Sequence, residues 1–224
     1  MRFACLAALA LVAAPAAAET TQDQRVWFNA TWMGSISGNL VGFAEVQPRS
    51  GDGLSRLDQI ILRPAIGWRI GKALTVYQGY ARVINPVDGG PDLKEHRSFQ
   101  QVSWTPFSGR AAEVQSRTRL EQRLRADGGD TGWRAREMLR YEHALSGRQG
   151  DLAALVYGEL FVALNDTDWG ARRGFDQARS FVGVEVPLGG RSTAEIGYLN
   201  QTIDRTRGRT QVNHVASITL FWRP

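Results

Sequence analysis

One stretch of the sequence alternates between two kinds of side chain over thirteen residues. The odd positions from Glu113 to Arg125 are all glutamate, glutamine or arginine, and the even positions between them are mostly small or apolar. Successive side chains of a strand point to opposite faces, so this period places all the charge on one face. A tilted strand crosses a bilayer with about nine to eleven residues. The stretch is therefore long enough to form one wall of a transmembrane barrel.

The first segment of the chain predicts export. Residues 1–18 carry one positive charge at Arg2, continue as an apolar run and end in Ala16-Ala17-Ala18 before Glu19. This is the layout of a cleaved secretory signal peptide, and the run is too short for a spanning helix. We expect a signal peptide at 1–18 and a single barrel domain at 19–224. The only cysteine, Cys5, lies in the leader, which excludes disulfides and thiol chemistry from the mature chain.

The mature chain divides into short blocks separated by Gly, Pro, Asn, Asp and Ser. Such spacing predicts an all-β meander, and the sequence has no apolar segment long enough for a helical span. The predicted strands are 26–33, 38–49, 57–70, 73–84, 96–105, 112–125, 132–145, 151–164, 175–188, 192–203 and 212–222.

The connections between these blocks alternate in length. The joints at 70–73, 105–110, 146–150 and 188–191 are tight. The connections at 47–53, 84–95, 125–132, 164–174 and 203–211 are longer and polar. Short turns at one end and long loops at the other are typical of outer-membrane barrels, whose short turns face the periplasm.

The faces of the strands also fit a membrane barrel. Ile60, Leu62, Ile66 and Trp68 share one face of their block, opposite Arg63. Six tryptophans fall near predicted strand ends, as interfacial girdles require: Trp27, Trp32, Trp68, Trp104, Trp133 and Trp222. Apolar side chains outward, polar side chains inward and aromatic ends together predict a transmembrane antiparallel up-and-down β-barrel.

Three features strain this interpretation. Glu137 falls on the apolar face, where a charge at mid-depth is costly. Residues 111–126 and 133–145 are rich in helix formers, and 152–164 could also form a buried helix. Bacterial barrels close with an even number of strands, whereas eleven blocks are visible. We expect about twelve strands, with the hidden one in 19–32 or after Leu164, and ten as the alternative.

With these blocks in view, the chain resembles the Gram-negative family known as domain of unknown function 2490 (DUF2490). The matching motifs are Leu62–Trp68, Gln78-Gly79-Tyr80, Glu95-x-Arg97-x-x-Gln100-Gln101, Arg117-x-Arg119-Leu120-Glu121-Gln122-Arg123, Gly158-Glu159-x-Phe161, Ala178-Arg179-x-x-x-Gly183, Glu195-x-Gly197-Tyr198 and Asn213-His214. The resemblance implies a secreted β-barrel of the outer membrane and carries no activity. The end of the chain departs from the usual aromatic ending, because Trp222 is followed by Arg223-Pro224.

The charged faces supply the candidate site. We assign to the lumen Glu45, Arg63, Arg82, Arg97, Arg117, Arg119, Glu121, Arg123, Arg134, Arg136, Arg140, Glu142, Glu159, Arg179, Glu185 and Glu195. Arginines and carboxylates can satisfy each other in a confined space, so the network could simply fill and stiffen a narrow barrel. Alternatively, rings of charge could form a small anion-selective passage or pocket.

Two other classes of function stay open. An outer-membrane lipid hydrolase would need a serine activated by His96, His143 or His214, and no tight motif of that kind occurs. A soluble periplasmic barrel for an apolar ligand would turn the apolar faces inward. Neither a metal-ligand spacing nor a cofactor motif is visible.

Composition limits the partners. The chain has 27 Lys+Arg and 22 Asp+Glu, interleaved along the sequence, which argues against nucleic-acid binding. The expected partners are outer-membrane lipid, lipopolysaccharide and, during insertion, the barrel assembly machinery. The sequence does not indicate an oligomeric state.

Overall fold

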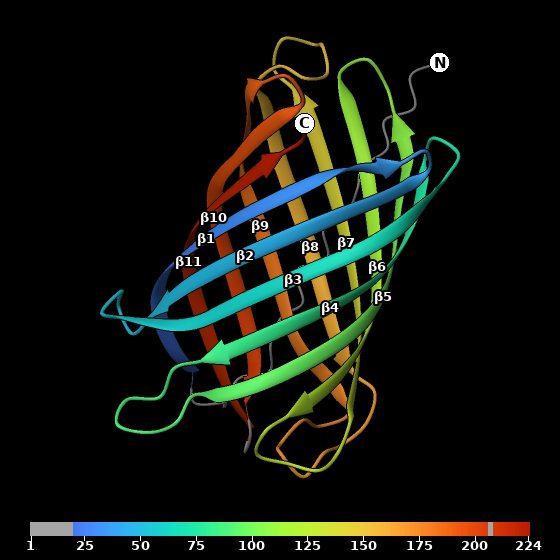
Figure 1. Cartoon of the computed structure of the whole chain (residues 1–224). Helices are drawn as coiled ribbons and strands as arrows, with labels where there is room; N and C mark the ends of the chain where they lie inside the picture. Colours follow the sequence, from blue (N-terminus) through green and yellow to red (C-terminus); the bar gives the residue numbers. More distant parts are fainter. Residues whose placement is uncertain (1–19, 206–207) are drawn as a thin grey trace.

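The computed structural model describes residues 20–205 and 208–224, which form an eleven-stranded closed barrel (Figure 1). The strands are β1 (Thr20–Ser37), β2 (Leu40–Gly51), β3 (Arg56–Ile70), β4 (Leu74–Asn85), β5 (Leu93–Ser108), β6 (Ala112–Arg125), β7 (Gly132–Ala144), β8 (Ala153–Ala163), β9 (Gly174–Gly189), β10 (Ser192–Arg205) and β11 (Arg209–Trp222). No described helix is long and apolar enough to cross a membrane. The predicted signal peptide lies outside the described residues.

The barrel closes through a parallel pair. Each strand pairs antiparallel with the next, whereas β1 runs parallel to β11, from Thr20 opposite Thr210 to Trp32 opposite Trp222. An odd number of up-and-down strands leaves the first and last pointing the same way, so their ladder must be parallel. The described residues contain no twelfth strand. Of the two stretches predicted to hide one, residues 20–32 form most of the long strand β1, and the residues after Leu164 form the connection between β8 and β9.

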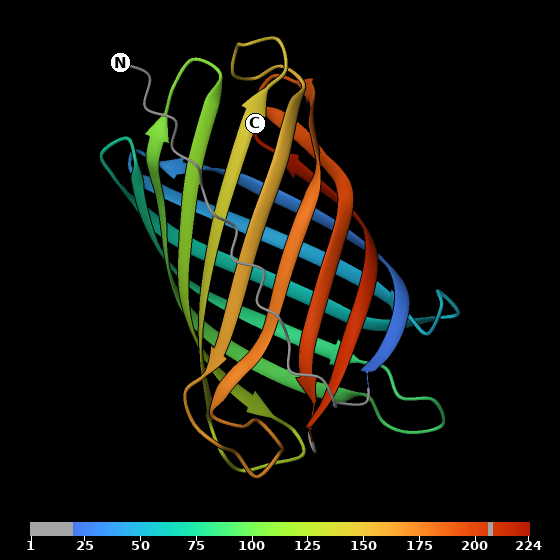
Figure 2. The same ribbon diagram turned by 180° about the vertical axis from the view of Figure 1, so that it is seen from behind.

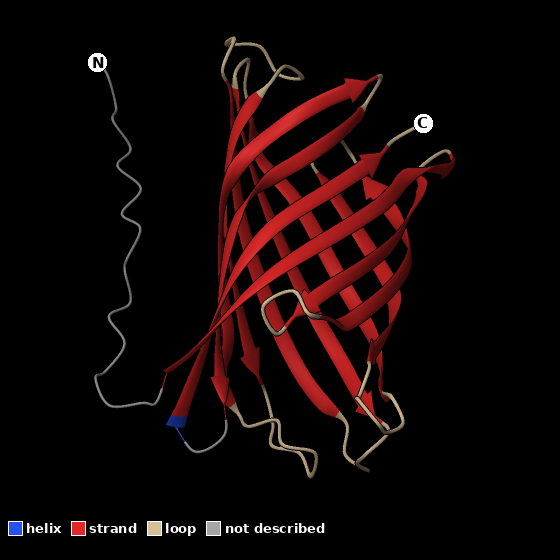
Figure 3. Cartoon of the chain, turned by 90° about the vertical axis from the view of Figure 1, so that its left-hand side faces the viewer, coloured by secondary structure: helices blue, strands red, loops and turns tan. Residues whose placement is uncertain are grey.

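The helix-rich composition of two segments does not decide their structure. Residues 112–125 and 132–144 form β6 and β7, which pair from Ala112 opposite His143 to Arg123 opposite Gly132. Intrinsic helix propensity is a weak prior that tertiary pairing overrides. As Figure 3 shows, strands make up most of the described chain.

The two ends of the barrel differ in their connections (Figures 1 and 2). The short-turn end carries residues 38–39, 71–73, 109–111, 145–152 and 190–191, together with the C-terminus. The long-loop end carries residues 52–55, 86–92, 126–131 and 164–173. There β10 ends at Arg205, β11 begins at Arg209, and β1 also begins. The predicted alternation is thus present, with two differences: residues 145–152 form a longer turn than expected, and β10 and β11 extend until their connection is short.

The outer wall is largely apolar. Side chains that face away from the lumen include Leu62, Ile66 and Trp68 on β3 and Val182 on β9, and each is between 41% and 56% exposed. Five of the six predicted girdle tryptophans lie on this wall, near the strand ends. The exception is Trp27, which is 3% exposed and faces into the lumen. It shares the parity of the inward residues Asn29 and Thr31, and it lies well inside β1 because β1 begins earlier than predicted.

Candidate functional site

The lumen contains fifteen of the sixteen residues assigned to it. Each is either nearly buried or lines the central cavity, and they occupy alternate positions on eight strands: Glu45, Arg63, Arg97, Arg117, Arg119, Glu121, Arg123, Arg134, Arg136, Arg140, Glu142, Glu159, Arg179, Glu185 and Glu195. The period of two in the sequence was sufficient to identify this face.

Arg82 is the exception and lies on the outer wall. Its neighbours along β4, Ala81 and Val83, are 1% and 0% exposed and point inward. Arg82 itself pairs across the sheet with Leu62 and His96, both on the outer face. The inward positions of this part of β4 are apolar, so its charge falls on the opposite side, contrary to the sequence prediction.

Glu121 and Glu159 hold the centre of the charge network. Glu121 is 1% exposed and accepts hydrogen bonds from Arg134 and Arg136, each at 2.6 Å. Glu159 also accepts from Arg136, at 2.6 Å, and from Arg117, at 3.0 Å. Charge-assisted bonds of this length are strong, and they offset the cost of burying the charges. The network joins three strands, β6, β7 and β8, from inside the barrel.

Aromatic rings complete the filling of this part of the lumen. Phe99 and Phe161 are 0% and 1% exposed. The guanidinium carbon of Arg119 lies 4.4 Å from the ring centre of Phe99, and that of Arg136 lies 4.3 Å from the ring centre of Phe161. Gly79 leaves room for the first ring, because a Cβ there would lie 2.1 Å from it. These are cation–π contacts in a desolvated site.

The sequence analysis did not predict these inward aromatic residues, because it treated the inner face as polar. Phe99 stands between Arg97 and Gln101 at the inward parity of β5. The same parity argument could therefore have identified it. In the long-loop half of the lumen the inward side chains are packed closely, as the near-zero exposure of Ile61, Val83 and Val215 indicates.

The other half of the lumen is hollow. A cavity of about 610 Å³ is lined by residues of all eleven strands and by turn residues at the short-turn end, including Lys72, Gly150 and Arg191. Its mouth is therefore at that end, and its inner end meets the filled half. Ligand-binding cavities are commonly of this size.

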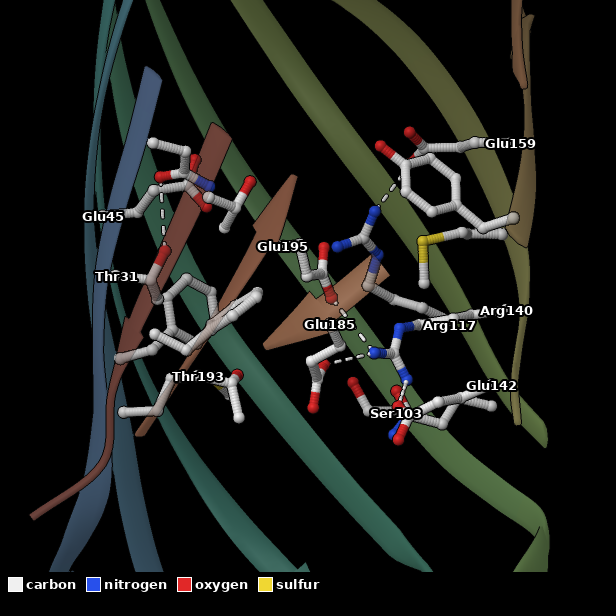
Figure 4. A pocket seen from close by; sticks show the side chains of 18 of the residues that line it. Thr31, Glu45, Ser103, Arg117, Arg140, Glu142, Glu159, Glu185, Thr193 and Glu195 are labelled. Carbon is white, nitrogen blue, oxygen red and sulfur yellow. Dashed lines mark hydrogen bonds and ion pairs between the residues drawn. The ribbon is translucent and has the colours of Figure 1, made fainter. Parts of the chain in front are cut away.

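A cluster of four charges lies on the wall of the cavity near its mouth. Arg140 contacts Glu142 at 2.8 Å, Glu185 at 2.6 Å and Glu195 at 3.1 Å. Figure 4 shows the arginine reaching toward the two carboxylates of β9 and β10, while Arg117 points toward Glu159 deeper in the lumen. The cluster itself has three carboxylates around one guanidinium, and the lining near the mouth also includes Lys72, Arg191 and Arg223, which balance this charge.

The inner end of the cavity lacks this balance. Six arginines line it: Arg49, Arg63, Arg117, Arg119, Arg136 and Arg179. Three glutamates accompany them, namely Glu45, Glu159 and, beneath the cavity floor, Glu121. This leaves an excess of three positive charges in a region largely closed to solvent. Arg49 and Trp27 were not among the predicted lumen residues, although Arg49 has the parity of Glu45 on the same strand.

The three histidines lie on the outer wall, away from the cavity. Each ring Nδ1 is hydrogen-bonded to a tyrosine hydroxyl, in the pairs Tyr80–His96, Tyr141–His143 and Tyr198–His214. Ser217, three residues after His214, lines the cavity on the other face. Within residues 20–205 and 208–224, no group of His, Cys, Asp or Glu is arranged to hold a metal ion.

Glu137 does face outward, as the sequence pattern indicated. Its carboxylate accepts hydrogen bonds from the hydroxyls of Ser116, at 2.7 Å, and Thr118. Both partners lie on the neighbouring strand β6 and on the same face. These hydrogen bonds reduce the cost of placing a carboxylate on an otherwise apolar wall.

Comparison with known proteins identifies relatives but no activity. A family model described as "Protein of unknown function (DUF2490)" matches residues 24–213. An uncharacterized protein of Methylorubrum extorquens is 50% identical over 222 residues, which cover 97% of this chain and 96% of the relative. No solved structure matches the chain.

Proposed function

The chain belongs to the DUF2490 family, and we propose that it is an outer-membrane β-barrel that does not conduct and receives a small solute in a one-ended cavity. The single observation that carries the proposal is the filled cross-section at Glu121, Phe99 and Phe161, each no more than 1% exposed. A water-filled pore would leave its wall residues exposed. The anion-selective passage predicted from the sequence would require these side chains to move apart.

The outer wall supports insertion in a membrane. Its strands are 11 to 18 residues long, and a tilted strand needs about nine to eleven to span a bilayer. Trp32, Trp68, Trp104 and Trp222 gather toward the short-turn end of the wall, as an interfacial belt requires. The N-terminal segment has the layout of a signal peptide. Outer-membrane lipid and lipopolysaccharide would contact this wall, and the barrel assembly machinery would insert it.

The polarity of the two faces favours this proposal over a soluble barrel for an apolar ligand. Such a barrel needs an apolar lumen and a polar exterior, whereas here Arg136 and Glu159 are inside and Leu62 and Ile66 are outside. The hydrolase has no geometric support either, because the histidines pair with tyrosines on the outer wall. On the rule that short turns face the periplasm, the cavity opens to the periplasm.

Fractionation tests the location. We expect the protein to remain with the outer membrane after carbonate washing, and recovery in the soluble periplasm would contradict the proposal. In reconstituted liposomes, brominated lipids should quench the fluorescence of Trp32 and Trp222 but not that of Trp27, each measured as the loss of signal in its Trp→Phe variant.

Planar-bilayer recording tests the closed lumen. We expect no steady conductance from the folded wild-type protein. Phe99→Ala combined with Phe161→Ala should introduce channel-like steps if these rings fill the cross-section. The double variant Trp68→Ala and Trp104→Ala is the matched control, since it removes two aromatic rings from the outer wall. Steady wild-type conductance would show that the lumen is open.

A further inference from the structure

Arg49 is a buried cation without a carboxylate partner. It is 8% exposed, and its guanidinium donates to two amide oxygens, that of Gln47 at 2.7 Å and that of Gln59 at 3.0 Å. Among the described residues, no aspartate or glutamate forms an ion pair with it. Buried charges in proteins are normally paired, because an isolated ion loses its hydration without compensation.

Trp27 brings a second unsatisfied donor to the same place. The guanidinium carbon of Arg49 lies 3.8 Å from its ring centre, and that of Arg179 lies 5.1 Å away. The indole is 3% exposed, and its N–H has no acceptor in the described chain. A buried indole N–H usually finds a hydrogen-bond partner. Two guanidinium groups and one free indole N–H thus gather at one point of the cavity wall.

Other donors at this end of the cavity are also free. Buried N–H groups without a protein acceptor occur on the side chains of Arg49, Arg63, Arg119 and Arg179. The contact of Arg179 with Glu159 is long, at 3.6 Å, and that of Arg119 with Glu121 is equally long. All the unsatisfied groups here are donors, and they coincide with the excess of positive charge. A neutral or cationic ligand would leave both the donors and the charge uncompensated.

We propose that the inner end of the cavity binds one small oxyanion, a carboxylate or a phosphate, between Arg49, Arg179 and the indole N–H of Trp27. The planar fork of arginine matches the oxygens of either group. The site rests on the proposed function only in requiring that the cavity be reachable from its mouth. It differs from a purely structural network, because Arg134 and Arg136 already donate to Glu121, whereas these three residues keep free donors.

Anion titration of the folded protein in detergent tests the site. Sodium phosphate and sodium acetate are titrated separately at constant ionic strength, with calorimetry as the readout, so the two arms distinguish the two chemistries. We expect saturable binding of at least one anion, with affinity falling as salt is raised. Arg49→Gln should weaken it about tenfold or more, as expected for losing a charged hydrogen-bond donor.

Two further variants make the outcome decisive. Trp27→Phe keeps the ring and removes only the N–H, and it should weaken binding several-fold even if Arg49→Gln fails to fold. Arg148→Gln makes the same change on an exposed turn at the short-turn end, outside the lining of the cavity, and should leave affinity unchanged. The shift in gel mobility on heating reports folding of each variant.

The assignment of the site is refuted if the wild-type protein binds neither anion saturably. It is also refuted if the folded Arg49→Gln and Trp27→Phe variants bind the anion as tightly as the wild type does. Such a result leaves the membrane location and the closed lumen untouched, because fractionation and bilayer recording measure those independently. Conversely, steady conductance of the wild-type protein or a soluble location would refute the proposed function, whereas the titration would still measure anion binding at the site.

Discussion

In the half of the lumen next to the long loops, Phe99 and Phe161 fill the space between paired charges, whereas in the half next to the short turns small polar residues such as Thr31, Ser103 and Thr193 leave a cavity. Both halves contain arginines and glutamates at inward positions of the same strands. The difference therefore does not come from the charge ladder. It lies in how the uncharged inward side chains are arranged: Phe99 and Phe161 pack into the charge network of the filled half, whereas rings such as Phe43 and Tyr157 lie along the wall of the cavity.

The comparison also separates satisfied from unsatisfied charge. Glu121 in the filled half is surrounded by arginines that donate to it, and Arg134 has a second carboxylate, Asp176, at 2.8 Å. At the boundary of the hollow half, Arg49 has amide partners only. A complete network stabilises and fixes the wall, whereas incompletely paired arginines at the end of a cavity can bind a solute.

The largest effect on stability is expected from Phe99→Ala. Removing a fully buried ring should cost about 3–5 kcal/mol in the free energy of unfolding, because the surrounding strands cannot collapse into the space. Urea unfolding in detergent micelles measures it. The matched variant Phe221→Ala removes a ring from the cavity wall and should cost clearly less. Equal losses would mean that the two halves are not packed differently.

The second largest effect is expected from Glu121→Gln. This substitution should lower the free energy of unfolding by roughly 3 kcal/mol, the lower end of the range for breaking a buried ion pair. Arg134 and Arg136 lose their shared carboxylate, although each keeps another one, Asp176 or Glu159. The same urea titration measures the loss. A change near zero would show that the network contributes no net stability.

The same substitution near the mouth, Glu142→Gln, should cost about 1 kcal/mol or less, as for partly hydrated ion pairs. Arg140 keeps Glu185 and Glu195, and removing Glu142 also relieves repulsion between carboxylates. Comparison with Glu121→Gln in one experiment isolates the effect of position. A larger loss at Glu142 than at Glu121 would reverse the proposed order of the two halves.

The smallest effect concerns the loops beyond the filled half. Asp168 accepts hydrogen bonds from the backbone N–H groups of Gly129, at 2.7 Å, and Asp130, at 3.2 Å, and these bonds hold its pKa below the ordinary value of 3.8. This contribution is present above the unfolded pKa and is lost as pH falls through the lower, folded value.

Hydrogen exchange at the amides of Gly129 and Asp130 measures this effect. Relative to intrinsic exchange rates, protection of both amides should fall between pH 5 and pH 2, and Asp168→Asn should weaken it at pH 5. Global unfolding should change little, because the contact joins two exposed loops. The variant Asp151→Asn, at the short-turn end, is the control. Unchanged protection at low pH would contradict the assigned contact.

Much of the fold was predictable because it depends on local pattern. Turn residues marked ten connections, and the period of two placed fifteen of sixteen charged residues on the correct face. Arg82 was misplaced because its own strand carries alanine and valine inward. Trp27 was misplaced because its position near the start of the predicted block resembled a strand end. In both cases the face that the side chain occupies follows from the parity of the neighbouring inward residues. That parity can be assigned only when the extent of the strand is known.

The sequence by itself determined where the strands run and which side chains share a face, since both follow from the alternation of side chains along one strand. Only the tertiary structure decided how the barrel closes, which half of the lumen is filled and which charges meet. The β1–β2 pairing sets Trp27 opposite Arg49, and closure through parallel β1 and β11 brings Arg179 of β9, from a distant part of the chain, close to the Trp27 ring. Periodicity along one strand carries no information about the partners across a lumen.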